Sequence, residues 1–228
     1  MTLKAGAAAA GLVAVIAGFS AWGWLATPAG ADIPVHWDAT GAPDRYGGKA
    51  EAFLLTPAIA VALSLILLAA PHIDPRGRNL ARSGAVLNTV WLGTLAVLAA
   101  AQAGIALTAA GVFTPEGGAI PLLVGLSACA LMIVLGNVLG KARPNWFVGV
   151  RTPWTLSSDR SWDAAHRWAG RGFVASGLLG GAAILLAPIE AGFAVFTVAV
   201  LVTAAGAVVL SYFVWRSDPD RETFNEPG

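Results

Sequence analysis

Charged side chains are scarce in this chain. Only 12% of its 228 residues are Asp, Glu, Lys or Arg, whereas a soluble domain carries about a quarter. This scarcity excludes an ordinary water-soluble globule. With 57% hydrophobic residues and a mean hydropathy of +0.70, much of the surface needs a bilayer as its solvent. We therefore predict an all-α, polytopic transmembrane helical bundle.

Cysteine is almost absent as well. Cys129 is the single cysteine and lies in an apolar run, which excludes an intramolecular disulfide and a thiol metal cluster. His, Asp and Glu form no set with an established metal-ligand spacing, so we expect no metal and no cofactor. A formal net charge of +1 carries no signature of nucleic acid binding, and we expect none.

Long apolar runs are what the chain has instead. About 20 residues of helix cover a hydrocarbon core of roughly 30 Å, and six runs reach or approach this length. They lie at about 5–25, 53–70, 84–112, 119–139, 172–189 and 192–214. The first exceeds the roughly 7–15 apolar residues of a signal peptide, so we interpret it as a span. Pro188 and Gly192 favour a tight turn between the last two runs; one bent helix is the alternative.

Basic residues are distributed unevenly between the two sides of this predicted bundle. Twelve of the 14 Lys and Arg residues fall on one side, and only Arg45 and Lys49 fall on the other. The positive-inside rule then places both termini in the cytoplasm, where the basic residues can also meet anionic lipid headgroups.

The predicted organisation has three parts. Residues 1–71 form two spans joined by an extracytoplasmic loop at 26–52. Residues 72–216 form a four-span region with a cytoplasmic loop at 140–171. Residues 217–228 form a polar tail that we expect to be disordered.

The outer loop at 26–52 is polar and rich in turn signals. Val35 and Trp37 alternate with His36 and Asp38, which is typical of a short extended piece. The loop is interpreted either as a compact segment lying on the membrane or as a recognition surface. A metal site of His36, Asp38 and Asp44 is a weaker alternative, because its spacing matches no established pattern. The candidate ligand-facing residues are His36, Trp37, Asp38, Gly41, Pro43, Asp44, Arg45 and Tyr46.

The inner loop at 140–171 contains a helix start. Ser157 or Ser158 suits an N-cap, and Asp159 suits the first turn, so we predict a helix from about 159 into the fifth span. Asn137, at the inner end of the fourth span, is expected to cap that helix or to bond a neighbour.

Acidic and histidine residues share one face of this predicted helix. Asp163 and Arg167 stand four apart and can pair, and Asp159, Asp163 and His166 lie on the same side. Such a face could hold a metal or perform acid–base chemistry. Without a fourth ligand or a nucleophile in matching register, a salt-bridged helix next to the membrane is the better interpretation.

The middle of the inner loop combines arginines, prolines, tryptophans and short polar side chains. We predict a packed, hydrogen-bonded unit in which Arg143 and Arg151 act as planar donors, whereas Arg76 only sets orientation. The candidate residues of this inner segment, here called the signature residues, are Asn137, Arg143, Pro144, Asn145, Trp146, Gly149, Arg151, Thr152, Pro153, Trp154, Thr155, Ser157, Asp163, His166 and Arg167.

Two stretches, 34–47 and 136–157 followed by His166 and Arg167, together resemble the bacterial SdpI-type immunity protein family. Gly140 stands where proline is expected, and Ala165 where threonine is usual. The resemblance implies a bacterial plasma membrane protein that protects its producer from a secreted toxic peptide. The founding member also holds a transcriptional repressor at the membrane when toxin is present.

The function expected from the resemblance is therefore immunity or signal transduction, against a secreted toxic peptide or in envelope-stress sensing. Membrane lipids, a toxic peptide outside and a repressor inside are the expected partners. A small-solute transporter or a membrane-embedded enzyme using the inner loop is the alternative.

Overall fold

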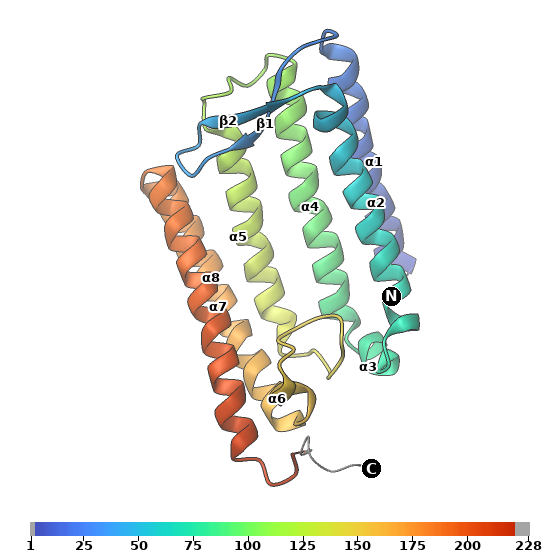
Figure 1. Ribbon diagram of the computed structural model, residues 1–228, viewed down its shortest axis with the longest axis vertical. Helices are drawn as coiled ribbons and strands as arrows, with labels where there is room; N and C mark the ends of the chain where they lie inside the picture. Colours follow the sequence, from blue (N-terminus) through green and yellow to red (C-terminus); the bar gives the residue numbers. More distant parts are fainter. Residues whose placement is uncertain (1–2, 222–228) are drawn as a thin grey trace.

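Six long helices form the body of the molecule (Figure 1). The computed structural model describes residues 3–221, and within them these six helices are long and apolar enough to cross a membrane. The predicted all-α transmembrane bundle with six spans is thus confirmed. The helices are α1 (Leu3–Ala26), α2 (Lys49–Ile73), α4 (Gly84–Ala109), α5 (Ala119–Leu139), α7 (Asp159–Leu186) and α8 (Ile189–Arg216).

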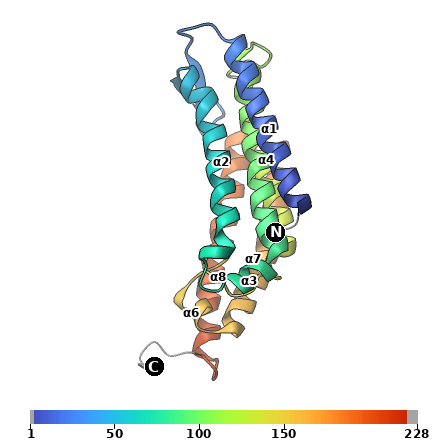
Figure 2. The same cartoon turned by 90° about the vertical axis from the view of Figure 1, so that its right-hand side faces the viewer.

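The bundle is flat, as the edge-on view in Figure 2 shows. Helices α4 and α5 lie in the middle, with α1 and α2 on one side and α7 and α8 on the other (Figure 1). Packing follows this order, because α1 contacts α4, α4 contacts α5, α5 contacts α7, and α7 contacts α8. Both wide faces therefore remain open to the surrounding membrane.

Glycines bring α5 and α7 into close contact. A Cβ placed on Gly136 would lie 2.5 Å from the Gly170 carbonyl oxygen, and one on Gly177 would lie 2.5 Å from the Cys129 carbonyl oxygen. No side chain fits either position. Small residues at such crossings let helices associate in lipid without a hydrophobic driving force.

The last two apolar runs form two separate helices. Ala187, with φ −125° and ψ 171°, and Pro188, with φ −52° and ψ 140°, are both extended. This break turns the chain back, so α7 and α8 pack side by side. The expectation of a tight turn is confirmed, and so is the helix start near 159, because α7 runs unbroken from Asp159 into the apolar run.

Each end of the bundle carries one distinctive segment. At one end, here called the hairpin end, β1 (Ile33–Trp37) and β2 (Pro43–Gly47) pair in antiparallel orientation. This two-stranded sheet is the one element outside the all-α class among the described residues. At the other end, here called the signature end, lie α3 (Gly77–Arg82), α6 (Pro153–Leu156) and the loop at 140–158.

Candidate functional site

Asn145 organises the loop at the signature end. Its side chain is fully buried and uses all of its hydrogen-bonding capacity. Oδ1 accepts from the backbone N–H groups of Phe147 (2.8 Å) and Val148 (2.7 Å), while Nδ2 donates to the carbonyls of Arg143 (2.8 Å) and Val148 (3.2 Å). An irregular loop leaves buried backbone groups without helical partners, and one amide here replaces those partners.

His166 clamps the next turn of the same loop. The Val150 N–H donates to His166 Nε2 at 3.0 Å, so this nitrogen carries no proton, and Nδ1 donates to the Trp162 carbonyl at 2.8 Å. The imidazole is therefore a neutral, single tautomer. It stacks on the Trp162 ring at 4.0 Å, and both side chains are buried. Trp162 in turn donates from Nε1 to the Ala142 carbonyl at 2.9 Å.

Gly149 passes over the His166 ring in a conformation that requires glycine. Its φ is +119°, and a Cβ there would lie 2.1 Å from His166 Nε2. A side chain is thus excluded both by backbone strain and by the buried ring.

A short capping structure closes the loop on the last two helices. Thr152 accepts from the Thr155 N–H (3.2 Å) and its own N–H donates to Thr155 Oγ1 (3.0 Å), a capping box with Pro153 at the first helical position. Thr152 Oγ1 also lies 3.2 Å from Ser211 Oγ on α8. The Trp154 ring packs edge-on against Tyr212 at 5.2 Å. These contacts fix the end of the loop to α8.

The turn between α2 and α4 holds the loop from the other side, and the sequence analysis missed this anchor. Asp74, buried at 7% exposure, accepts from the Arg76 N–H (2.7 Å) and the Trp146 N–H (3.0 Å). Asn79 donates to the Pro144 carbonyl at 3.0 Å, and Ser83 Oγ accepts from the Arg143 N–H at 2.8 Å. The loop is therefore fixed to both halves of the bundle. In the sequence, Asp74 stands out only as a single acidic residue between apolar and basic residues.

The arginines act differently from the predicted planar donors. Arg143 is exposed and is held through its backbone N–H, and exposed Arg151 donates only to the Trp146 carbonyl. Arg76, expected to set orientation alone, donates from Nη2 to the Leu156 carbonyl at 3.1 Å. Of the two predicted donors, Arg151 thus donates one hydrogen bond from its guanidinium, whereas Arg143 is bonded through its backbone. Arg76 makes a structural contact that the sequence did not suggest.

The remaining signature residues fall outside or at the edge of this network. Asn137 is exposed and donates to the Ile133 carbonyl of its own helix, so it neither caps α5 nor bonds a neighbour. Asp163 and Arg167 pair at 3.7 Å on the surface, as expected for a salt-bridged helix. Ser157 donates to the Pro153 carbonyl at 2.8 Å.

The acidic face predicted on α7 does not converge on one point. His166 is buried under Gly149 with both ring nitrogens occupied, whereas Asp163 points to solvent with half of its side chain exposed. Among residues 3–221, no group of three or more His, Cys, Asp and Glu side chains could hold a metal.

The start of the predicted disordered tail is folded onto the signature end. Ser158, the N-cap of α7, accepts from the Ser161 N–H and donates to Asp218 Oδ2 at 2.5 Å. Asp218 is buried at 5% exposure, and the hydrogen bond from Ser158 lowers the pKa of its carboxyl. Arg221 donates to the Asp218 carbonyl at 2.9 Å. Residues 222–228 of the predicted tail lie outside the described residues.

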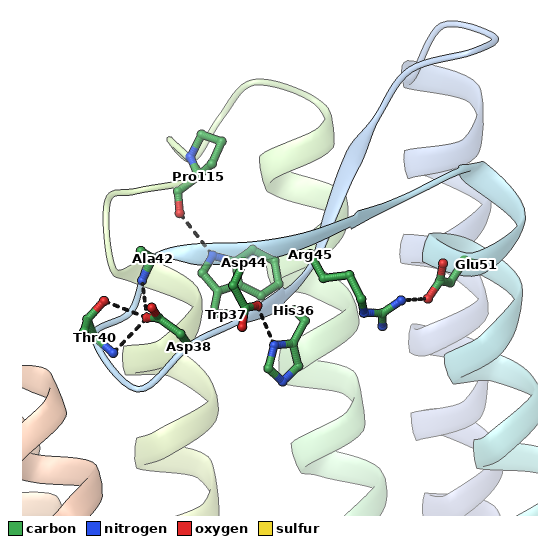
Figure 3. Close-up of polar contacts among 9 residues, drawn as sticks. All are labelled: His36, Trp37, Asp38, Thr40, Ala42, Asp44, Arg45, Glu51 and Pro115. Carbon is green, nitrogen blue, oxygen red and sulfur yellow. Dashed lines mark hydrogen bonds and ion pairs between the residues drawn. The ribbon is translucent and has the colours of Figure 1, made fainter.

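At the hairpin end, Asp38 builds the turn between the two strands (Figure 3). Its Oδ1 accepts from the Thr40 N–H (2.8 Å), the Thr40 hydroxyl (2.6 Å) and the Ala42 N–H (3.1 Å). The hydrogen bond from Thr40 is the main cause that lowers the pKa of Asp38. Gly41 completes the turn with φ +87°. The turn is thus a defined structure and not a loose loop.

The charged side chains of the hairpin pair locally and do not gather into a ligand set. His36 Nδ1 lies 2.6 Å from Asp44 Oδ1 across the two strands, and Arg45 pairs with Glu51 at the start of α2 (Figure 3). Asp38 faces its own turn. The suggested metal set of His36, Asp38 and Asp44 is therefore not brought together.

The hairpin is seated on the ends of the helices beneath it. Trp37 donates from Nε1 to the Pro115 carbonyl at 3.1 Å (Figure 3), and a Cβ on Gly41 would contact the Ile189 side chain at 3.3 Å. Pro43 begins β2 opposite Trp37. Tyr46 is half exposed.

Beneath the hairpin lies a cavity of about 450 Å³. Its roof is β1 with the start of the turn, and its walls come from α4, α5 and α8. The lining is apolar except for three side chains, His36, Asp38 and Thr197. This cavity could not be predicted from the sequence, because its walls come from three separate apolar runs.

The two ends differ in charge. The hairpin end carries six acidic residues, Asp32, Asp38, Asp44, Glu51, Glu116 and Glu190, against two basic ones, Arg45 and Lys49, a formal net charge of −4. The other 12 Lys and Arg residues all lie at the signature end.

Comparison with known proteins matches each end to a family model. Residues 141–213 match the SdpI/YfhL protein family, and residues 11–61 match a domain of unknown function, DUF1648. The first match contains the loop with its clamp and anchors to α8; the second contains the hairpin. About a third of the chain, residues 141–213, is thus similar in sequence to the SdpI/YfhL family.

A curated member of the family shares part of its sequence with this chain. The immunity protein SdpI of Bacillus subtilis (strain 168) is 35% identical over 60 residues, which is 26% of this chain and 29% of the relative. The match therefore spans less than a third of that protein. No solved structure matches. With six apolar helices of spanning length and this similarity to the SdpI/YfhL family, the chain is a multi-pass cell membrane protein.

Proposed function

We propose that this chain, which is similar to the SdpI/YfhL family over residues 141–213, is a membrane immunity protein that protects its cell from a secreted toxic peptide. The observation that carries the proposal is the family region at 141–213, together with a relative whose name is immunity protein. The structure supports it by giving that region a single defined conformation at one end of the bundle, built around Asn145 and His166.

The proposal includes an orientation. The signature end carries 12 of the 14 Lys and Arg residues, and such an excess favours the cytoplasmic side. The acidic hairpin end then faces outside, where a secreted peptide arrives. Surface-exposed tryptophans, Trp22 and Trp24 near that end and Trp146 and Trp168 at the other, suit the two membrane interfaces.

The signature end is proposed to transmit or support the response inside the cell. Its loop is fixed to α2–α4 through Asp74 and to α7–α8 through His166 and Thr152. A displacement of the two halves of the bundle would therefore reach the same loop. Its outer surface presents Arg143, Arg151 and half-exposed Trp146, a basic and aromatic face suited to a cytoplasmic protein such as a transcriptional repressor.

Survival of cells tests the proposal directly. A strain lacking this gene and the same strain carrying it are challenged with peptides secreted by neighbouring species, and colony counts are compared. We expect the gene to raise survival against at least one peptide. The Asn145→Ala variant, whose loop loses four hydrogen bonds, should lose the protection, whereas Arg78→Ala, at an exposed position in α3, should keep it. Equal survival with and without the gene against every peptide would refute the proposal.

A further inference from the structure

The cavity beneath the hairpin lies between three of the apolar helices. Its walls, which include Ala101 of α4, Val124 of α5 and Phe193 of α8, belong to apolar helices that face lipid on the wide faces of the bundle. Its volume of about 450 Å³ lies in the range of sites that hold a small ligand or several apolar side chains. The lining therefore favours an apolar occupant.

Carboxylates surround the roof of this cavity. Asp38 lines it directly. Glu116 follows Pro115, whose carbonyl accepts from Trp37, and Glu190 follows Ile189, which contacts Gly41. Both glutamates are exposed. Each thus adjoins a residue next to the hairpin turn, whereas Arg45 of β2 pairs with Glu51 and Lys49 of α2 donates to the Thr27 carbonyl, so the rim of the cavity is negative.

We propose that the cavity receives the apolar side chains of a cationic amphipathic peptide. This inference rests on the proposed function and adds the chemistry of the ligand and its place of binding. Apolar residues of the peptide fill the space between α4, α5 and α8, while its Lys or Arg side chains meet Asp38, Glu116 and Glu190 at the rim. Complementary charge also speeds the encounter of such a peptide with this end of the protein.

Charge decides against the other occupants. An anionic lipid headgroup would meet the net charge of −4 at this end, and a second copy seated through the same end would meet its own carboxylates. An uncharged apolar chain would fill the cavity but would form no ion pair with the carboxylates at its rim. The three cases therefore differ in their response to the charge of the ligand and to salt.

Peptide binding in nanodiscs tests the proposal. The full chain is placed in phosphatidylcholine nanodiscs, and three fluorescent helical peptides are titrated: one of Leu and Lys, one with Glu for Lys, and one with Ser for Leu. Empty nanodiscs give the background. We expect saturable binding of the Leu–Lys peptide above this background and at least tenfold weaker binding of the other two. Raised salt should weaken the interaction, because exposed charges are screened.

Two kinds of variant locate the site. Ala101→Phe, which fills the cavity, should weaken binding at least tenfold, whereas Ala96→Phe, on the same helix but in a groove lined by Asn88 and Leu131, should not. Glu116→Gln combined with Glu190→Gln should weaken binding roughly three- to tenfold, as expected for two exposed ion pairs. Size-exclusion profiles confirm that each variant is folded.

The outcomes separate this inference from the proposed function. Equal binding of all three peptides, or equal loss in Ala101→Phe and Ala96→Phe, would overturn the inference even if the gene protects cells. Selective binding that depends on Ala101 and on the glutamates, without protection of cells, would leave the site standing and refute immunity.

Discussion

Replacing Gly149 by alanine should break the signature loop. Gly149 holds φ +119°, and its added Cβ would lie 2.1 Å from Nε2 of buried His166. The backbone conformation alone costs a non-glycine residue about 1–3 kcal/mol. Moving the ring also leaves the Val150 N–H and the Trp162 carbonyl without their partners, at about 1–3 kcal/mol for each buried group.

Together these costs amount to roughly 3–9 kcal/mol. In a chain of this size, such a loss lowers the melting temperature by roughly 6 °C or more. Melting is followed by fluorescence of the purified protein in detergent. Gly140→Ala is the matched control, because Gly140 has a helical φ of −65° and its added Cβ would meet only Arg167, at ordinary distances of 3.5 Å or more. It should shift the melting temperature by a few degrees at most.

A double variant isolates the contact with the ring. His166→Ala alone should destabilise the protein by losing its two hydrogen bonds. Because Gly149→Ala loses the same bonds, the two effects should not add in the double variant. The contact between Gly149 and the His166 ring would be refuted if Gly149→Ala had the same melting temperature as Gly140→Ala. It would also be refuted if the stability losses of Gly149→Ala and His166→Ala added fully in the double variant.

Three further perturbations follow from the contacts. The pKa of Asp218 is lowered in the folded state. The ionised carboxylate therefore stabilises the fold at pH values above the ordinary pKa of 3.8, and this stabilisation is lost as the pH falls below it. The melting temperatures of wild type and Asp218→Asn should differ near neutral pH and converge at lower pH. Arg151→Lys and Arg76→Lys should each lower the free energy of unfolding by no more than about 1.5 kcal/mol, since each arginine side chain donates one hydrogen bond. A loss of folding in either variant would show a role beyond that bond. Cysteine placed at Lys141 should react with a membrane-impermeant reagent only in opened cells, and cysteine at Glu116 in intact cells; the reverse pattern would invert the orientation.

The bundle itself could be predicted from the sequence because bilayer thickness sets the length of an apolar run. The starts of helices were predictable only where a cap was visible. Ser158 and Asp159 marked α7 thirteen residues ahead of the predicted apolar run. For α2, which begins at Lys49, Gly48 makes no side-chain cap, and the predicted run began four residues late.

The residues of the candidate site could be predicted from the sequence, but their hydrogen-bond partners could not. Asn145, Thr152, Thr155 and His166 were identified, and all are at the centre of the hydrogen-bonded loop. Their partners could not be identified, because a residue type says which bonds a side chain can make but not with which backbone groups. For the same reason, the prediction gave the Arg151 guanidinium a larger role than its hydrogen bond to the Trp146 carbonyl supports.

Asp74 shows why the missing partners matter for the function. Its carboxylate joins the Arg76 N–H at the turn after α2 with the Trp146 N–H in the signature loop. Asp74 lies outside both regions matched by family models, 11–61 and 141–213, yet in the structure it connects the helices of one to the loop of the other. The hairpin precedes α2, and the signature loop follows α5. A change in the position of α2 caused at the hairpin end would thus reach the loop through this carboxylate, and the two matched regions would act as one protein.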